Sequence, residues 1–341
     1  MFLDPKPISG TCKETAGLPA GAADTPTVRR HFHFLLLPGA NMLDFAGAME
    51  PLRVANGLFR EPVYSWTLVS ETGGPVRCSN GVSFPVDGKL GDTSPSDCVV
   101  ICSGSTGFLD AGPKTLQWLR RHMRFGGRAA ALATGAFTLA RAGLVKSDGL
   151  TLHWSMVPVF EELFPELDCL NTRTMLDDAI SYSAGGSCSL DVTLSIIEED
   201  LGYSCAQGVA DVCIYDYGSN DGRNQRQSIS KRVGTRHPSF VNILKKMEEL
   251  IQEPASLDEL IADEPISKRQ VERLFSKYLN TTPMRYFRDM RLDRARKLLQ
   301  GTDMPIIEIA AATGFASVNN FSKHYRLRFG RRPHSDREAA A

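Results

Sequence analysis

Residues 128–144 read RAAALATGAFTLARAGL, and this stretch decides how the first part of the chain is interpreted. A short run of small and apolar residues reaches a turn at Ala133-Thr134-Gly135, and a helical pattern follows. This is the pattern of a nucleophile elbow, in which the end of a strand lifts one side chain over a pocket. The elbow residue should be Cys or Ser, and here it is Ala133. Because a methyl group can neither ionise nor attack a carbonyl, thiol-dependent hydrolysis at this position is excluded.

Short apolar strands alternate with helical patterns on both sides of the elbow. This alternation predicts a parallel sheet covered by helices on both faces, an α/β sandwich. Ser189, which follows the Gly185-Gly186 turn, is typical of a helix N-cap. The predicted strands are residues 31–37, 64–69, 98–102 and 129–133, and the predicted helices are residues 42–58, 115–125, 135–142 and 190–201.

The length and the local composition predict two domains. At 341 residues, the chain exceeds the size at which one hydrophobic core usually stops growing. Residues 218–238 are polar and rich in Gly, Asn, Gln and Ser, and only helical patterns follow them. We therefore expect a flexible tail over residues 1–28, an α/β domain over 29–217, a linker over 218–238 and an all-α domain over 239–336.

Composition narrows the class of protein further. No apolar run approaches the roughly 20 residues that span a bilayer, and residues 1–28 lack the apolar core of a secretion signal. The eight cysteines include no C-x-x-C pair, which indicates reduced thiols in a cytoplasmic protein and argues against structural zinc. We expect no membrane contact, no metal and no cofactor.

Charge is distributed unevenly although the whole chain is formally neutral. Residues 268–341 contain 16 Lys and Arg against 7 Asp and Glu, a net charge of +9, and the rest of the chain carries −9. A basic end suggests an electrostatic partner, most often nucleic acid. A solvated basic surface is the alternative, and charge alone does not decide between the two.

The basic end contains two similar helical units. Ser267 and Ser317 are each typical N-caps for an amphipathic helix, and each helix is preceded by a short helix and a tight turn. This pattern predicts two helix-turn-helix units, joined by a long helix over residues 283–299 with Gly301 just past its end.

SKRQVERLFSKYLNTTPMRYFRDMRLDRARKLL (267–299) and IIEIAAATGFASVNNFSKHYRLRFGRRP (306–333) resemble the AraC-type DNA-binding domain. The resemblance implies binding to double-stranded DNA, because Arg, Lys and Asn read guanine and adenine edges. The first unit departs from the family pattern: Ile261 replaces a close-packing alanine and Pro265 a turn glycine, so its turn must differ and its contacts are less certain. The candidate DNA-binding residues, with a solvated face as the alternative reading, are Lys268, Arg269, Arg273, Ser317, Asn319, Asn320 and Lys323.

FLLLPGANMLDFAGAMEPLRVAN (34–56), the elbow and LTLHW (150–154) together resemble the PfpI-like, class I amidotransferase-like domain of GlxA-type regulators. EPLRVAN, SNG and IYDYGSNDGRNQRQSI look closest to regulators of carnitine, glycine betaine and arginine catabolism. The resemblance implies a carboxylate at Asp44, the nucleophile position at Ala133 and a histidine at His153. Cys102 could replace the nucleophile only if the fold placed it at the elbow. The candidate ligand-binding residues are Asp44, Ser103, Gly104, Ala133, Thr134, His153 and Trp154.

Asp44 could attract a cationic amine, and Trp154 or Trp66 could offer a ring face to a quaternary ammonium. Both tryptophans are alternatively core residues, and His153 alternatively hydrogen-bonds the elbow. We expect either a relaxed backbone at Ala133 or a ligand packed against its methyl group.

The sequence thus predicts a non-enzymatic transcription regulator that responds to a small nitrogenous metabolite. The resemblance implies an activator, a homodimer formed through the first domain, and RNA polymerase as a partner. An enzyme fused to a DNA-binding domain and a ligand-independent DNA-binding protein are the rival classes.

Overall fold

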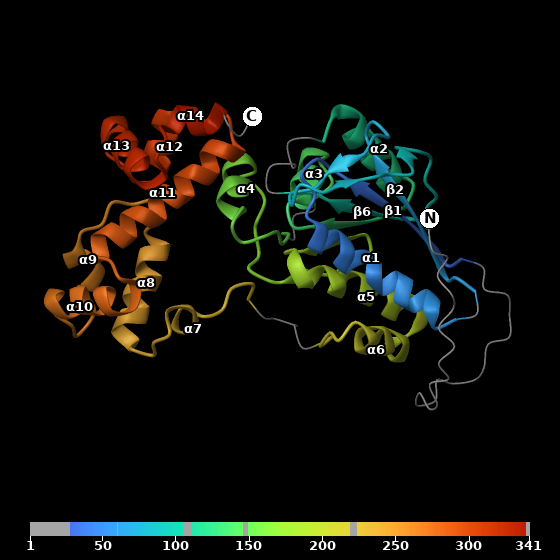
Figure 1. Ribbon diagram of the computed structural model, residues 1–341, viewed down its shortest axis with the longest axis horizontal. Coiled ribbons are helices and arrows are strands. Elements are labelled where there is room, and N and C mark those ends of the chain that lie inside the picture. Colours follow the sequence, from blue (N-terminus) through green and yellow to red (C-terminus); the bar gives the residue numbers. More distant parts are fainter. Residues whose placement is uncertain (1–27, 60, 105–110, 146–148, 219–223, 339–341) are drawn as a thin grey trace, which may run out of the picture.

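The computed structural model describes residues 28–59, 61–104, 111–145, 149–218 and 224–338. The predicted flexible tail lies outside these residues except for Val28. An α/β part and a helical part follow one another along the chain (Figure 1). Within the described residues, no helix is both long enough and apolar enough to cross a membrane.

The centre of the α/β part is a seven-stranded sheet, in which the four predicted strands lie together as β2, β1, β6 and β7. All neighbouring strands pair in parallel except β8, which runs antiparallel to β9. A separate two-stranded antiparallel sheet joins β3 (Val76–Arg77) to β4 (Ser83–Phe84). The order across the main sheet is β5 (Gly88–Lys89), β2 (Tyr64–Ser70), β1 (Arg30–Leu36), β6 (Cys98–Cys102), β7 (Arg128–Leu132), β9 (Ile180–Ser183) and β8 (Thr174–Met175).

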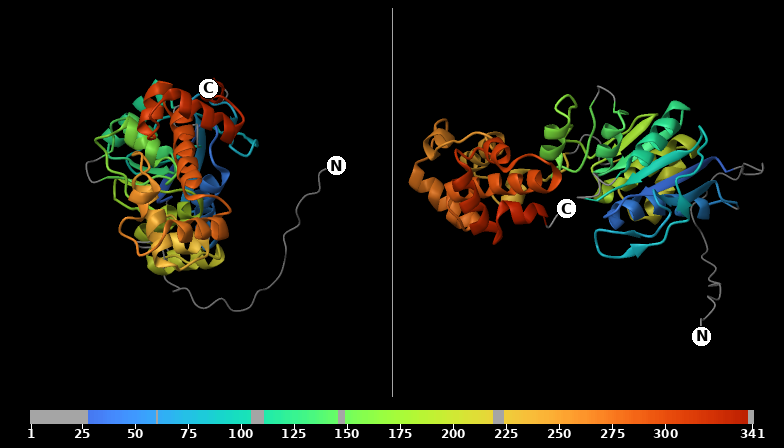
Figure 2. Two further views of the ribbon diagram at one scale, coloured as in Figure 1. Left: turned by 90° about the vertical axis from the view of Figure 1, so that its left-hand side faces the viewer. Right: turned by 90° about the horizontal axis from the view of Figure 1, so that it is seen from above.

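Helices cover both faces of this sheet, as expected (Figures 1 and 2). Successive side chains of a strand point to opposite faces, so Phe32 and Phe34 join one apolar cluster and Leu35 joins the other. The Phe34 face packs against α1 (Met42–Gly57), α5 (Ser189–Leu201) and α6 (Tyr203–Val212). The Leu35 face packs against α2 (Pro113–Arg124), α3 (Gly135–Arg141) and α4 (Val157–Leu163).

The predicted N-cap role of Ser189 is wrong. Helix α5 already includes Ser189, and Cys188 occupies the cap position. The hydroxyl of Ser189 is buried without a hydrogen-bond partner among the described residues. A 3-10 turn over Gly186–Cys188 leads directly into α5 and moves the start of the helix toward the two glycines.

The helical part begins inside the predicted linker with α7 (Ile229–Val233), and none of its described residues lies in a strand. Gly301 is the last residue of α11, so the prediction that it lies past the helix is wrong. The C-cap is Thr302, whose hydroxyl donates to the Leu298 carbonyl. The remaining elements are α8 (Pro238–Glu249), α9 (Leu257–Ile261), α10 (Lys268–Leu279), α11 (Pro283–Gly301), α12 (Ile306–Ala312), α13 (Val318–Phe329) and α14 (Pro333–Glu338).

The two predicted helix-turn-helix units are α9–α10 and α12–α13, and α11 joins them. Ser267 caps α10 in a reciprocal capping box with Gln270, and the Ser317 hydroxyl caps α13. Helix α11 also packs against α4 of the α/β part (Figure 1). Residues of α11, α12 and α13 therefore belong to the same apolar cluster as the α2–α3–α4 face of the sheet.

Candidate ligand site and DNA-reading face

The elbow keeps the backbone of a nucleophile position. Strand β7 ends at Leu132, α3 begins at Gly135, and Ala133 between them has φ = 49°. An L-residue in this region carries about 1–2 kcal/mol of strain. The elbow is therefore not relaxed, and of the two expected alternatives only a ligand packed against the methyl group remains. The backbone is held from both sides: the Ala133 amide donates to the Ser183 carbonyl at 2.8 Å, and the Thr134 hydroxyl donates to the Gly104 carbonyl at 2.7 Å.

Asp44 and Ala133 meet at the Gly185-Gly186 turn. Gly185 has φ = 90°, and a Cβ built on it would lie 2.7 Å from the Ala133 methyl and 3.2 Å from each carboxylate oxygen of Asp44. Only glycine fits there, because the methyl and the carboxylate converge on the same backbone atom. The sequence predicts this glycine pair only as a turn, because its closeness to the elbow depends on the pairing of β7 with β9.

Asp44 is fully buried on α1, and only part of its hydrogen-bonding capacity is used. Its Oδ1 accepts from the Gly186 amide at 2.5 Å, whereas Oδ2 has no partner among the described residues. Burial raises the pKa of the Asp44 carboxyl to about 6, and the Gly186 hydrogen bond partly opposes this rise. The carboxyl is therefore ionised at neutral pH without a counter-charge at Oδ2.

Ser103 and Gly104 lie directly after β6, at the carboxyl edge of the sheet, where α/β folds bind ligands. A Cβ on Gly104 would lie 1.8 Å from the Gly39 carbonyl oxygen, so no other residue fits without moving the loop after β1. The Ser103 hydroxyl is buried without a hydrogen-bond partner among the described residues. Two unpaired oxygens, on Asp44 and Ser103, are thus buried at this edge.

His153 and Trp154 form a second group, on the loop before α4. The Nδ1 of His153 lies 2.9 Å from the Ser155 hydroxyl, and no hydrogen bond among the described residues joins His153 to Asp44. Burial lowers the pKa of the imidazole, and the nearby Lys297 ammonium lowers it further. Trp154 lies under two cationic side chains, Arg226 and Lys297. Trp66, on β2, packs against the apolar cluster of the α1–α5–α6 face.

Neither cysteine near the elbow can replace the missing nucleophile. Cys102 has no exposed surface, and burial raises the pKa of its thiol well above the ordinary value. Burial also raises the pKa of Cys188, and the carboxylates of Asp191 and Asp44 contribute in the same direction. Both sulfurs remain protonated thiols at neutral pH, and a thiol is a poor nucleophile. Among the described residues, no group of three His, Cys, Asp or Glu side chains could hold a metal ion.

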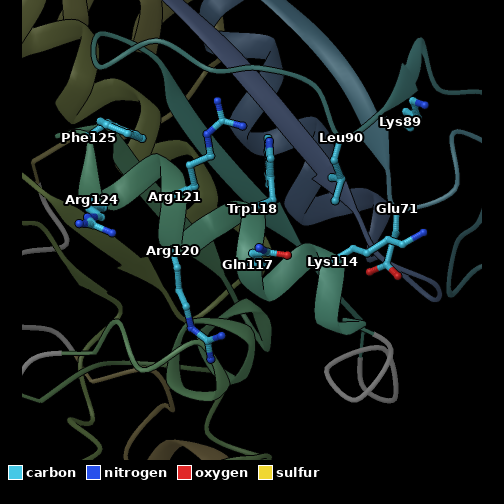
Figure 3. Close-up of a pocket in the computed structure, with 10 residues that line it drawn as sticks. All are labelled: Glu71, Lys89, Leu90, Lys114, Gln117, Trp118, Arg120, Arg121, Arg124 and Phe125. Carbon is cyan, nitrogen blue, oxygen red and sulfur yellow. The ribbon is translucent and has the colours of Figure 1, made fainter.

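A separate basic groove of about 830 Å³ lies along α2 (Figure 3), and none of the predicted ligand residues lines it. Its one carboxylate, on Glu71, accepts from the Gly112 amide and the Thr115 hydroxyl, so it caps the start of α2. No local sequence signal indicates this groove, because β5 and α2 are brought together only by the sheet. It is lined by Glu71, Lys89, Leu90, Lys114, Gln117, Trp118, Arg120, Arg121, Arg124 and Phe125.

The predicted DNA-reading residues of the first unit lie exposed at the start of α10. Arg269 and Arg273 are exposed, whereas the ammonium of Lys268 is paired with the Asp258 carboxylate at 2.7 Å. The neighbouring Val271 and Phe275 are buried, so α10 turns one face to the core and the basic face to solvent.

The predicted residues of the second unit lie on α13 and at its cap. Asn319, Asn320 and Lys323 are exposed, while Phe321 and Tyr325 face the core. The Ser317 hydroxyl accepts from the backbone N–H of Asn320 at 3.3 Å, so Ser317 has a structural role as the N-cap of α13. Helix α11, with 19 residues, is about 28 Å long.

Comparisons with known proteins identify both parts. Residues 33–199 match the DJ-1/PfpI family, and residues 261–339 match a helix-turn-helix domain. A crystal structure of a THiJ/PfpI family protein from Pseudomonas syringae aligns with a TM-score of 0.50 and 20% identity, covering 69% of this chain and 93% of that one, which supports the fold.

Curated relatives extend the match over nearly the whole chain. The HTH-type transcriptional regulator CdhR from Pseudomonas aeruginosa is 35% identical, covering 90% of this chain and 91% of the relative. The HTH-type transcriptional regulator GlxA from Rhizobium meliloti is 34% identical, covering 93% and 98%.

The fold and the paired helical units define a DNA-binding transcriptional regulator with an attached DJ-1/PfpI domain. The chain belongs to the AraC-type family of transcriptional regulators that carry this domain, together with GlxA and CdhR. It is a regulator and not an enzyme, in agreement with the alanine at the elbow.

Proposed function

We propose that this chain is a cytoplasmic transcription activator that responds to a small nitrogenous metabolite, an amino acid or a quaternary amine. Residues 29–217 sense the metabolite and form a homodimer, residues 239–336 bind promoter DNA and act on RNA polymerase, and residues 218–238 link the two. The sequence resemblance to regulators of carnitine, glycine betaine and arginine catabolism supports a nitrogenous effector.

The observation that carries the effector class is the unpaired Asp44 carboxylate oxygen beside the Ala133 methyl. An ionised carboxylate that is buried with one oxygen unpaired and without a counter-charge is costly, and a bound cation offsets that cost. The unpaired Ser103 hydroxyl supplies a second polar contact at the same sheet edge. The methyl in place of a thiol lets a ligand bind there without being attacked.

The raised pKa of Asp44 gives this proposal a pH signature. A cationic ligand binds the ionised carboxylate, and the pKa of that carboxyl is about 6 in the free protein. Affinity should therefore fall about tenfold for each pH unit below 6 and become nearly constant above it. A neutral ligand would show no such dependence.

Thermal-shift screening of amino acids and amines tests the proposal, because a ligand that binds only the folded chain raises its melting temperature. Asp44→Asn should abolish the shift from a cationic ligand. Asp178→Asn is the matched control, since Asp178 is fully exposed, and it should leave the shift unchanged. If every stabilising ligand binds an Asp44→Ala, His153→Ala variant as well as the wild type, the proposed ligand site is wrongly placed.

Activation and assembly need separate measurements. In transcription with purified RNA polymerase, the effector should raise the transcript yield from the target promoter, and sedimentation should give a dimer. A regulator whose DNA binding and transcription no small molecule changes would instead belong to the ligand-independent class.

A further inference from the structure

Trp154 carries two of the protein's own cations on its ring. The guanidinium carbon of Arg226 lies 4.2 Å from the ring centroid, and the ammonium of Lys297 lies 4.9 Å from it. Both distances are within the range of cation–π attraction. Lys297 belongs to α11, the helix that joins the two DNA-binding units, so the ring is a contact between the two parts of the chain.

Hydrogen bonds fix the Trp154 backbone in this contact. The side-chain oxygen of Gln225 accepts from the Trp154 amide at 2.7 Å. The side-chain nitrogen of Gln225 donates to the carbonyls of Leu152 at 2.8 Å and Thr172 at 2.9 Å. Gln225 and Arg226 thus tie the segment before α7 to the α/β part at the loop that presents the ring.

Apolar packing continues the contact along α4. Phe160 of α4 and Leu298 and Leu299 of α11 belong to one apolar cluster, and α4 and α11 lie side by side (Figure 1). Burial lowers the pKa of the Arg294 guanidinium on α11, and the carboxylates of Glu161 and Glu162 on α4 partly oppose this change. The α4–α11 contact therefore holds the helix on which both DNA-binding units are mounted.

We propose that Trp154 is a competitive cation site: a quaternary ammonium ligand takes the place of Lys297 and Arg226 over the ring and loosens the α4–α11 contact. The inference rests on the proposed function, since it assumes a cationic effector, and it adds Trp154 as a second cation site besides Asp44. Trp154 is 39% exposed, so a small cation reaches the ring from solvent. His153, next to it in the chain, packs against the same indole at 5.4 Å between ring centroids.

Competition of this kind couples ligand binding to the α4–α11 contact, and no other conformational change is needed. A ligand that binds the ring only when α11 has moved shifts the population toward the released form. Its apparent affinity is reduced by the fraction of chains in which the ring is occupied. Removing one of the two internal cations should therefore strengthen ligand binding. If Trp154 had only a structural role, this removal would leave ligand binding unchanged.

The experiment titrates tetramethylammonium into the full chain with Trp66→Phe and Trp118→Phe, so that Trp154 is the only tryptophan and its fluorescence reports the site. In this background, Lys297→Met should tighten tetramethylammonium binding by about 5- to 150-fold, the usual range of allosteric coupling. Lys245→Met, which removes an exposed lysine of α8, should leave the affinity unchanged. Circular dichroism checks that each variant is folded.

Hydrogen exchange is a second measurement, and it does not need the Trp66→Phe and Trp118→Phe replacements. Tetramethylammonium should speed exchange of the α4 and α11 amides in the wild type and have no effect on Trp154→Leu. Equal tetramethylammonium affinity for Lys297→Met and its parent, or no binding to either, overturns the inference. An effector that needs Asp44 but is insensitive to Trp154→Leu and Lys297→Met leaves the proposed function standing and removes this one.

Discussion

The two helix-turn-helix units reach the same fold with different turns. In the second unit, Gly314 has φ = 72° between α12 and α13. In the first unit, Pro265 stands in the turn, and residues 262–267 contain no positive φ. This outcome confirms the prediction that the first turn must differ, because proline fixes φ near −65°. A helix-turn-helix therefore does not require a left-handed residue, provided that the turn follows another path.

The units also differ in what they pack against. The first unit shares an apolar cluster with α8, which includes Phe240, Val271 and Phe275. The second unit shares its cluster with the α2–α3–α4 face of the sheet, through α11. A change in the α/β part thus reaches the second unit through a continuous core, whereas the first unit follows only through α11.

Gly314→Ala should lower the free energy of unfolding by about 3 kcal/mol. A left-handed alanine costs about 1–2 kcal/mol, and its Cβ would also lie 3.0 Å from the Gln252 carbonyl oxygen. Overpacking of this kind typically costs about 1–3 kcal/mol more. Gly330→Ala is the matched control, since Gly330 has φ = 73° but nothing within 4 Å of a Cβ, and it should lose only the backbone part. Equal losses in urea unfolding would show that the close packing at Gly314 contributes nothing.

Asn320→Ala in the second unit should weaken binding to the target DNA by about 1–3 kcal/mol, the value of a bidentate base contact. Arg273→Ala tests the first unit, where Pro265 changes the turn before the recognition helix. Fluorescence anisotropy at fixed salt compares target and random DNA, and loss of a base contact should reduce only the binding to the target. A double variant with Asn320→Ala and Arg273→Ala that binds like the wild type would contradict the assignment in both units.

Strand bounds and helix caps that depend only on neighbouring residues could be predicted from local sequence signals. Cys98–Cys102 was predicted with the bounds that β6 has, because a five-residue apolar run that stops at Ser and Gly is typical of a buried strand. The caps Ser267 and Ser317 were found for the same reason, since each accepts from the residue three positions later. Ser189 shows the limit of such signals: a 3-10 turn, which has no sequence signature here, displaced the helix start.

The rest of the site depends on contacts between distant segments. Asp44 and Ala133 were predicted as one site from the family resemblance, but their meeting point at Gly185 requires the β7–β9 pairing. Trp154 was considered as a ligand platform, and nothing near it in the sequence indicates Lys297, 143 positions away. The strained backbone at Ala133 could not be predicted from the sequence, because nothing about an alanine side chain indicates that the backbone keeps this conformation.

Pro265→Gly in the first unit should lower the free energy of unfolding by about 0.4–1 kcal/mol, mainly because glycine gives the unfolded chain more freedom. The direction matches that of Gly314→Ala, but the loss is smaller because the exposed Pro265 makes no tight contact. Urea unfolding of both variants under one condition measures the difference. A loss at Pro265 as large as the loss at Gly314 would mean that both turns are equally constrained, and the contrast between the units would fail.

Asp258→Asn should change DNA affinity more than stability. The Lys268–Asp258 pair is exposed on both sides, at 54% and 70%, so removing it costs only about 0.2–1 kcal/mol of unfolding free energy. The freed Lys268 can then neutralise a phosphate, which should raise affinity for any DNA a few-fold at low salt and steepen the salt dependence. Asp303→Asn is the control near the second unit: it removes the same charge from an exposed position without freeing Lys268. If both variants raise DNA affinity equally, the change in net charge explains the effect, and the release of Lys268 from Asp258 contributes nothing.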